Sequence, residues 1–220
     1  MRYFSFLLLA VCMSTLLSSC NQDAYFRLYS GEIMPYKELY CPVPSWMDPD
    51  FKLTEIYTRY RFKDKNGETS GFPSITGFDD KFREGYTYNV IIEEIYTYDK
   101  SLPIDATPSE FVVRLSKMIH KEKAIGYELR EFAIGPELYE KSPDMSYYQV
   151  TDRQTGHKMQ VSTQCLGGFW HYFRPGNDYV IKVCCHPPLA DVLPDTIDSD
   201  TDSGHEMWAV DIVSQTPATE

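Results

Sequence analysis

The feature that most constrains the fold is an internal repeat, in which one block of the sequence appears twice, 91 residues apart. The block 75–92 reads ITGFDDKFREGYTYNVII, and the block 166–183 reads LGGFWHYFRPGNDYVIKV. Six of the 18 positions are identical, and most of the others keep their apolar character. The identical pairs are Gly77/Gly168, Phe78/Phe169, Phe82/Phe173, Arg83/Arg174, Gly85/Gly176 and Tyr88/Tyr179. An ordered set of matches at one spacing predicts two copies of one structural unit.

The repeat divides the chain of 220 residues into a short N-terminal part and two units of similar length. We expect the first unit to give way to the second near residues 121–124. A unit of about 95 residues can bury somewhat more than about 60% of its unfolded surface, which is enough for a small core of its own. The expected segments are a lipoprotein signal peptide (1–19), a tether (20–31), a first β domain (32–122), a second β domain (123–215) and a tail (216–220).

Apolar and polar residues alternate with a period of two in several segments, which indicates β-strands. The clearest alternations cover residues 56–62, 86–92 and 208–212. Tyrosine-rich and β-branched segments that are separated by Gly and Pro turns are typical of all-β proteins. The sequence therefore predicts an all-β, mainly antiparallel fold, with two similar small domains in tandem that each resemble a β-barrel or a β-sandwich.

Two turns can be assigned from their glycines. Asn66-Gly67 favours a type I′ hairpin, because these residues tolerate the positive φ that this turn requires. The segment 174–177 reads Arg-Pro-Gly-Asn and matches a type II turn, which takes Pro at its second position and Gly at its third. We expect the repeated Arg83 and Arg174 to belong to turns of this kind, and a ligand loop formed by the two arginines is the alternative.

The repeated blocks share a pattern of Gly-Phe, a short gap, Phe-X-X-Gly, a following Tyr and alternating apolar residues. In this pattern the chain resembles a domain of unknown function that occurs in bacterial lipoproteins and often accompanies META/HslJ-type domains. The resemblance covers residues 75–119 well and residues 166–213 more loosely, and the upstream Cys pair usual in that family has no counterpart here. It implies a small β-rich module of the cell envelope with no known activity.

The N-terminus has the pattern of an export and lipid-anchoring signal. Arg2 precedes an apolar run over residues 4–17, which has the length of a signal-peptide hydrophobic region and is short for a bilayer core of about 30 Å. The run leads into Leu-Ser-Ser-Cys, ending at Cys20, which resembles a bacterial lipobox. We therefore expect Cys20 to become a lipidated N-terminus that anchors the protein in the outer membrane. The sequence leaves open whether the protein faces the periplasm or the exterior.

The remaining cysteines suit an oxidising compartment. Removal of the signal peptide takes away Cys12, and lipidation uses Cys20, which leaves Cys41, Cys165, Cys184 and Cys185. Neighbouring residues of a strand face opposite sides, so at most one of the adjacent pair can face Cys165. We expect a disulfide of Cys165 with either Cys184 or Cys185.

The acidic balance of the chain restricts its partners. The formal net charge is −11, from 21 basic and 32 acidic residues. Removal of the signal peptide takes away Arg2 alone, so 20 basic and 32 acidic residues leave −12. A protein that binds phosphate backbones needs a basic face, so we expect no nucleic-acid partner.

The sequence contains none of the common catalytic motifs. It lacks a Gly-X-Ser-X-Gly elbow, an HExxH motif, a phosphate-binding loop and the dinucleotide-binding glycines, and its five histidines have no ligand spacing. Glu93 and Glu94 are adjacent, but in a strand their side chains face opposite sides and do not share a substrate. We expect a non-catalytic protein that needs no cofactor.

An acidic segment offers the one local candidate for a metal site. Asp198, Asp200 and Asp202 have the spacing of the first ligands of a calcium loop. Glycine falls at loop position seven instead of six, and position twelve is Ala209 instead of Glu. A solvated acidic loop is therefore the favoured interpretation, with calcium binding as the alternative.

We expect a lipid-anchored envelope protein that acts as a binding or interaction module. Its partner is a protein or a glycan, and Trp46, Trp170 and His171 are candidate residues for stacking on sugars because they fall in predicted turns or loops. The competing interpretation of the 15% aromatic content is that it builds two small cores. A further alternative is a hydrolase that uses carboxylates brought together between the two domains.

Overall fold

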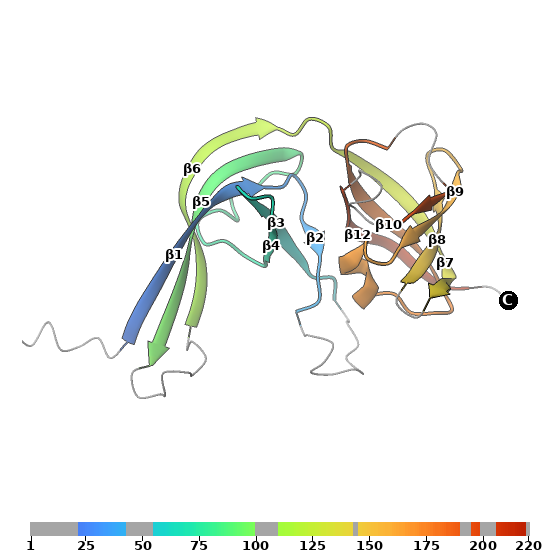
Figure 1. Cartoon of the computed structure of the whole chain (residues 1–220), viewed down its shortest axis with the longest axis horizontal. Coiled ribbons are helices and arrows are strands. Elements are labelled where there is room, and N and C mark those ends of the chain that lie inside the picture. The colour runs from blue at the N-terminus through green and yellow to red at the C-terminus, as the bar shows by residue number, and fades with distance from the viewer. Residues whose placement is uncertain are drawn as a thin grey trace, which may run out of the picture.

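The computed structural model describes residues 22–42, 55–99, 110–142, 145–189, 195–198 and 206–218. These residues form two sheets of β-strands and one short 3₁₀ helix (Figure 1). All strand pairs are antiparallel except the short pair of β11 with β9. The predicted all-β, mainly antiparallel class is confirmed, and the chain forms two sheets; both are open, so the barrel-like form that was also predicted is wrong.

The first sheet has the order β2-β3-β1-β5-β6, with β4 paired to β3. Its strands are β1 (Gln22–Ile33), β2 (Glu38–Leu39), β3 (Thr58–Asp64), β4 (Thr69–Phe72), β5 (Tyr86–Asp99) and β6 (Glu110–Lys123). The long strands β5 and β6 form a curved pair that crosses the whole domain (Figure 1).

The second sheet has the order β11-β9-β8-β7-β10-β12. Its elements are β7 (Glu128–Ser142), β8 (Met145–Asp152), β9 (Lys158–Ser162), the 3₁₀ helix η1 (Gly167–His171), β10 (Asn177–His186), β11 (Thr196–Ile197) and β12 (Glu206–Pro217). Across the sheet its main strands lie in the order β9-β8-β7-β10-β12, which matches β4-β3-β1-β5-β6 in the first domain. The two domains therefore share one topology.

The segment expected as a tether is instead mostly strand. β1 begins at Gln22 and pairs with β5 along its whole length, from Gln22 opposite Asp99 to Ile33 opposite Tyr88. The predicted tether is therefore wrong for residues 22–31. Their hydrogen-bond partners come from β5, a strand far along the chain that the local sequence does not indicate.

Both sheets are irregular at matching positions. The pairing of β5 with β6 shifts its register between Asn89 and Val90, and the pairing of β10 with β12 shifts between Val180 and Ile181, 91 residues later. A second shift follows two residues further on in each sheet. Because β-bulges bend and twist a strand pair, the two domains are bent at the same place.

One buried tyrosine in each domain holds the turn that precedes its strand. Tyr88 Oη accepts a hydrogen bond from the Arg83 N–H at 2.7 Å, and Tyr179 Oη accepts one from the Arg174 N–H at 2.8 Å. Each hydroxyl also lies 3.2 Å from the main-chain carbonyl oxygen seven residues earlier. These bonds explain why the same tyrosine occurs at matching positions of both blocks.

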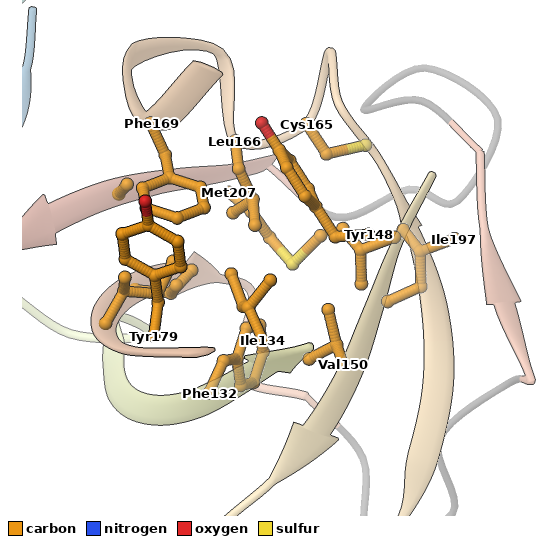
Figure 2. Close-up of a cluster of buried hydrophobic side chains, with 14 of the residues drawn as sticks. Phe132, Ile134, Tyr148, Val150, Cys165, Leu166, Phe169, Tyr179, Ile197 and Met207 are labelled. Carbon is orange, nitrogen blue, oxygen red and sulfur yellow. The ribbon is translucent and has the colours of Figure 1, made fainter. Parts of the chain in front are cut away.

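The two cores contain the same trio of aromatic rings, which Figure 2 shows for the second domain. The Phe169 ring centroid is 5.3 Å from that of Tyr148 and 5.2 Å from that of Tyr179. Edge-to-face contacts at this distance add to the stabilisation that ring burial supplies. The trio of the first domain, with centroids 5.4 and 5.0 Å apart, consists of Phe78 with Tyr60 and Tyr88.

The predicted hairpin turn at Asn66-Gly67 is present, but its type I′ assignment is wrong. Gly67 has a φ of 86°, whereas no residue other than glycine has a positive φ in the described ranges. The Gly67 N–H donates to the Asp64 carbonyl at 3.1 Å, and the Asp64 side chain accepts from two N–H groups of the loop. The loop is thus a three-residue turn with one left-handed glycine. At the second assigned turn, Gly176 has the positive φ that a type II turn requires.

Candidate functional site

The two domains meet where β2 of the first contacts η1 and β12 of the second (Figure 1). Leu39 of β2 is only 1% exposed and belongs to the core of the second domain. The two backbones approach so closely here that a Cβ atom at Gly168 would overlap the Leu39 carbonyl. Close packing therefore requires glycine at position 168, whereas the matching Gly77 has a positive φ of 78°.

An arginine of the first domain ties the two domains together. The Arg61 guanidinium contacts Glu38 at 2.9 Å and Glu206 of the second domain at 2.6 Å. It also lies 5.0 Å from the ring centroid of Trp208, and its side chain is 15% exposed. When an ion pair is mostly shielded from water, removal of one partner strongly destabilises the fold, because the other charge is left buried.

Two carboxylates at this junction, Glu38 and Glu206, are bound in ion pairs. Burial alone would raise the pKa of Glu206, but hydrogen bonds and charge from Arg61 and Lys63 hold that pKa below its usual value. Glu38 accepts bonds from both Arg59 and Arg61. Their arrangement favours a structural role for these carboxylates and gives no support to the hydrolase alternative.

Aromatic side chains line the junction beside this ion network. The Tyr172 hydroxyl accepts a hydrogen bond from the Tyr57 N–H at 2.9 Å and donates to the Tyr40 carbonyl at 2.8 Å. The rings of Tyr40 and Tyr57 contact edge to face, and the Arg59 guanidinium lies 5.6 Å from the Tyr40 ring centroid. One tyrosine of the second domain therefore orders two segments of the first.

Two candidate residues from the sequence lie on η1 at this junction. Trp170 is 48% exposed, and His171 follows it. Burial lowers the pKa of His171, and the nearby charges of Arg59 and Arg174 lower it further, so the imidazole is neutral near pH 7. We call the surface formed by these residues the junction surface, which comprises Tyr40, Tyr57, Arg59, Trp170 and His171.

The position of Trp170 is where the two matching cores differ in their hydrogen bonding. In the first domain the corresponding residue is Asp79, and its carboxylate accepts a hydrogen bond from the buried Tyr60 hydroxyl at 2.7 Å. In the second domain the Tyr148 hydroxyl is fully buried and has no hydrogen-bond partner among the described residues. A buried hydroxyl without a partner costs about 1–3 kcal/mol. Trp170 therefore occupies a position where a hydrogen-bond acceptor for the Tyr148 hydroxyl would stabilise the fold.

The structure does not join Cys165 to Cys184 or to Cys185. Cys184 packs with Met34 and Trp208 at the domain junction, while Cys165 and Cys185 belong to the core of the second domain. The adjacent pair thus faces opposite sides. Burial raises the pKa of Cys185 to about 12, and the Cys165 thiol lies 3.4 Å from the Asp198 carbonyl oxygen.

Of the proposed calcium ligands, only Asp198 lies in the described part of the chain, while Asp200 and Asp202 lie outside it. Asp198 accepts a hydrogen bond from the Tyr147 hydroxyl, which raises the pKa of Tyr147 to about 12. The described ranges contain no group of three or more His, Cys, Asp or Glu residues arranged to hold a metal ion. Cys20 and Trp46 also lie outside the described residues.

The remaining sequence candidates have structural partners. Arg83 Nη1 and Arg174 Nη1 each donate to two main-chain carbonyls of their own turn, which favours the turn interpretation over a ligand loop. Glu93 pairs with Arg114, whereas Glu94 is 8% exposed and accepts a bond from the Tyr96 hydroxyl. The two adjacent glutamates do face opposite sides of the sheet.

A hollow of about 340 Å³ lies on the second sheet, away from these candidates. Its two arginines are engaged within the protein, since Arg130 pairs with Glu128 and Asp152 and Arg153 pairs with Glu131. These pairs leave Lys182 as the lining cation for which no ion pair is recorded among the described residues. Its lining residues are Leu129, Arg130, Glu131, Arg153, Gln154 and Lys182.

Sequence reasoning missed the residues that build the junction. Arg61 and Glu206 are 145 positions apart, and no local pattern links them. The one sequence feature that pointed to the junction was the difference between Asp79 and Trp170, which occupy matching positions of otherwise similar blocks.

Within the described part of the chain, no helix has both the length and the apolar character that crossing a membrane requires. No family model, curated protein or solved structure gives a match to the chain.

Proposed function

We propose that this protein is a lipid-anchored, outer-membrane binding protein, built from two copies of one β unit that arose by tandem duplication. The apolar run over residues 4–17 and the lipobox-like sequence at Cys20 support the anchor. The ordered matches between the two blocks and the shared strand order support the duplication. The resemblance to a lipoprotein-associated domain agrees with a location in the cell envelope.

The observation that carries the binding role is the exchange of Asp79 for Trp170. The second domain gives up a hydrogen bond to the buried Tyr148 hydroxyl and gains a half-exposed indole at the junction surface. This change leaves the Tyr148 hydroxyl unpaired and about half of the indole in water, so hydrogen bonding in the core does not account for it. A ligand that packs on the indole supplies the missing reason for it.

A glycan is the ligand class that we favour for this surface. The half-exposed indole on η1, together with Tyr40 and Tyr57 on the segments bonded to Tyr172, offers flat apolar faces for sugar rings. Arg59, which is 38% exposed, offers hydrogen-bond donors for hydroxyl or carboxylate groups at the rim. A protein partner is the second candidate, because Trp and Arg are also frequent anchors of protein interfaces.

Trp170→Asp tests this proposal, because it restores to Tyr148 the acceptor that Asp79 gives to Tyr60. We expect the free energy of unfolding to rise by about 1 kcal/mol, and binding to a polysaccharide array to fall more than about tenfold. Trp170→Phe, which keeps an aromatic ring, should retain most of the array signal. An array on which the wild type binds nothing would count against a glycan. An array signal equal for the wild type and Trp170→Asp would remove Trp170 from the site.

A further inference from the structure

The first domain has an extension that the second domain lacks. β5 has 14 residues, whereas the matching β10 has 10. Residues 22–30 of β1 pair with β5 but have no strand on their other side among the described residues, because β3 pairs with β1 only at 31–33. The three strands β1, β5 and β6 therefore continue past the core as a narrow sheet, which Figure 1 shows bending away from the rest of the domain.

One face of this extension is aromatic. Tyr25, Tyr96 and Phe111 lie opposite one another on the three neighbouring strands. The rings of Tyr96 and Phe111 are 4.9 Å apart, and the exposed fractions of Tyr25 and Phe111 are 64% and 50%. Arg27 lies beside them, with its guanidinium 5.6 Å from the Tyr96 ring centroid.

The other face of the extension is aliphatic and aromatic. Phe26, Ile95 and Val112 form the next row across the same three strands, and Leu28 follows Phe26 on this face. Phe26 and Leu28 are 58% and 66% exposed. A soluble sheet that packs on one core usually has one apolar face and one polar face, whereas this extension has exposed apolar residues on both faces, with the ion pair of Glu93 and Arg114 beside Leu28.

These apolar residues lie outside the core of their own domain, whereas Leu129, which holds the position of Leu28 in the second sheet, packs at the domain junction. In the second domain the segment after β10 includes β11, which pairs with β9 and buries Ile197 in the core. The extension of the first domain instead holds its aromatic residues away from the core cluster of its own domain. Exposed apolar clusters of this kind mark interaction sites.

We propose that this extension dips into the interfacial region of the lipid bilayer that carries the Cys20 anchor, an inference that rests on the proposed lipidation. Only residue 21 separates Cys20 from the start of β1 at Gln22. At about 3.3 Å per residue, Tyr25 lies within roughly 17 Å of the anchored residue. A lipid surface can cover both faces of a narrow sheet, whereas a flat protein partner covers only one. Tyrosine and other aromatic residues favour the interface between headgroups and acyl chains.

Vesicle binding by the protein without its lipid tests the inference. The mature chain carrying Cys20→Ser is mixed with vesicles of phosphatidylethanolamine and phosphatidylglycerol and separated by flotation. We expect measurable association, and a decrease of at least about tenfold when Phe26→Ser and Leu28→Ser are added, because both changes remove apolar area that leaves water. Ile125→Ser is the matched control, since Ile125 is 88% exposed but lies between β6 and β7, and it should change binding less than about twofold.

The outcomes separate this inference from the proposed function. A folded Cys20→Ser protein that does not float with vesicles, or a double variant that floats as well as its parent, overturns the bilayer contact. A double variant that loses self-association in gel filtration but keeps vesicle binding assigns the extension to a second copy and also overturns it. The mass of the N-terminal peptide from membrane-purified protein tests lipidation independently. An acylated Cys20 without vesicle binding rejects only the contact, and an unmodified Cys20 with vesicle binding rejects only the anchor.

Discussion

Replacement of Arg61 by alanine is expected to lower the free energy of unfolding by about 3 kcal/mol or more. The change removes the cation that Glu38 and Glu206 share at the domain junction and leaves them only the more exposed Arg59 and Lys63, respectively. It also removes the guanidinium from the Trp208 ring. Because Arg61 joins β3 to β12, we further expect unfolding in urea to separate into two transitions. Intrinsic tryptophan fluorescence would follow them, because Trp170 and Trp208 both lie at the junction.

Two further variants make the Arg61 prediction specific. Arg59→Ala removes a 38% exposed arginine that pairs only with Glu38, so it should cost no more than about 1 kcal/mol. Adding Glu38→Gln and Glu206→Gln to Arg61→Ala should recover part of the loss, because the two carboxylates no longer repel each other. If Arg61→Ala unfolds at the same urea concentration as Arg59→Ala, Arg61 does not hold the domains together.

The second large effect is expected at Asp152, where alanine should cost about 3–5 kcal/mol. Asp152 is fully buried and accepts hydrogen bonds from the Arg130 guanidinium, the Thr155 hydroxyl and the Gln154 N–H. Arg130 is only 5% exposed, so the variant leaves a buried cation with Glu128 as its remaining carboxylate partner. Urea denaturation monitored by circular dichroism measures the loss.

The first domain supplies a matched control for Asp152. Asp64 occupies the same position before its hairpin turn and accepts bonds from the N–H groups of Asn66 and Glu68, but it is more exposed and has no buried arginine. Asp64→Ala should therefore cost only about 1 kcal/mol. Equal losses at Asp64 and Asp152 would show that the turn, and not the buried ion pair, supplies the stability.

The pH dependence of stability should reflect the same carboxylate. Burial alone would raise the pKa of Asp152, but the hydrogen bonds from Gln154, Arg130 and Thr155 hold it below its usual value. A depressed pKa means that the stabilisation is complete above the unfolded value near about 4 and is lost as the pH falls through the folded pKa. In Asp152→Ala this part of the acid dependence should be absent, as a comparison of urea midpoints between pH 5 and pH 3 would show.

The sequence was most informative where local patterns determine local structure. The alternation over 86–92 predicts the strand that became part of β5, and the Arg-Pro-Gly-Asn turn predicts the positive φ of Gly176. The Asn66-Gly67 hairpin was found but its turn type was not, because an Asp64 side chain that caps the loop allowed a different turn.

Long-range contacts account for what the sequence did not predict. β1 is a strand because β5 pairs with it, and nothing within residues 22–31 alone requires that pairing. Leu39 is buried by a domain that begins almost ninety residues later, at β7. The cysteine pattern did not show that Cys184 faces the domain junction while Cys185 shares a core with Cys165.

In the candidate site, too, local patterns were predictable from the sequence and long-range contacts were not. Trp170 and His171 could be selected as turn residues, and the structure places them at the junction surface. The Tyr148 hydroxyl that lacks an acceptor became visible only when the two cores were compared, because Tyr60 and Tyr148 lie outside the repeated blocks. A sequence comparison limited to these blocks shows the exchange of Asp for Trp but not its energetic cost.

The proposed location and function both depend on the lipid anchor. The mass of the N-terminal peptide tests this anchor most directly. The protein is expressed with its own signal sequence in a Gram-negative bacterium, purified from membranes and digested. We expect a peptide that begins at Cys20 and carries acyl chains, and we expect Cys20→Ser to yield no acylated peptide. A peptide that begins elsewhere, or a Cys20 without acyl chains, would contradict the anchor.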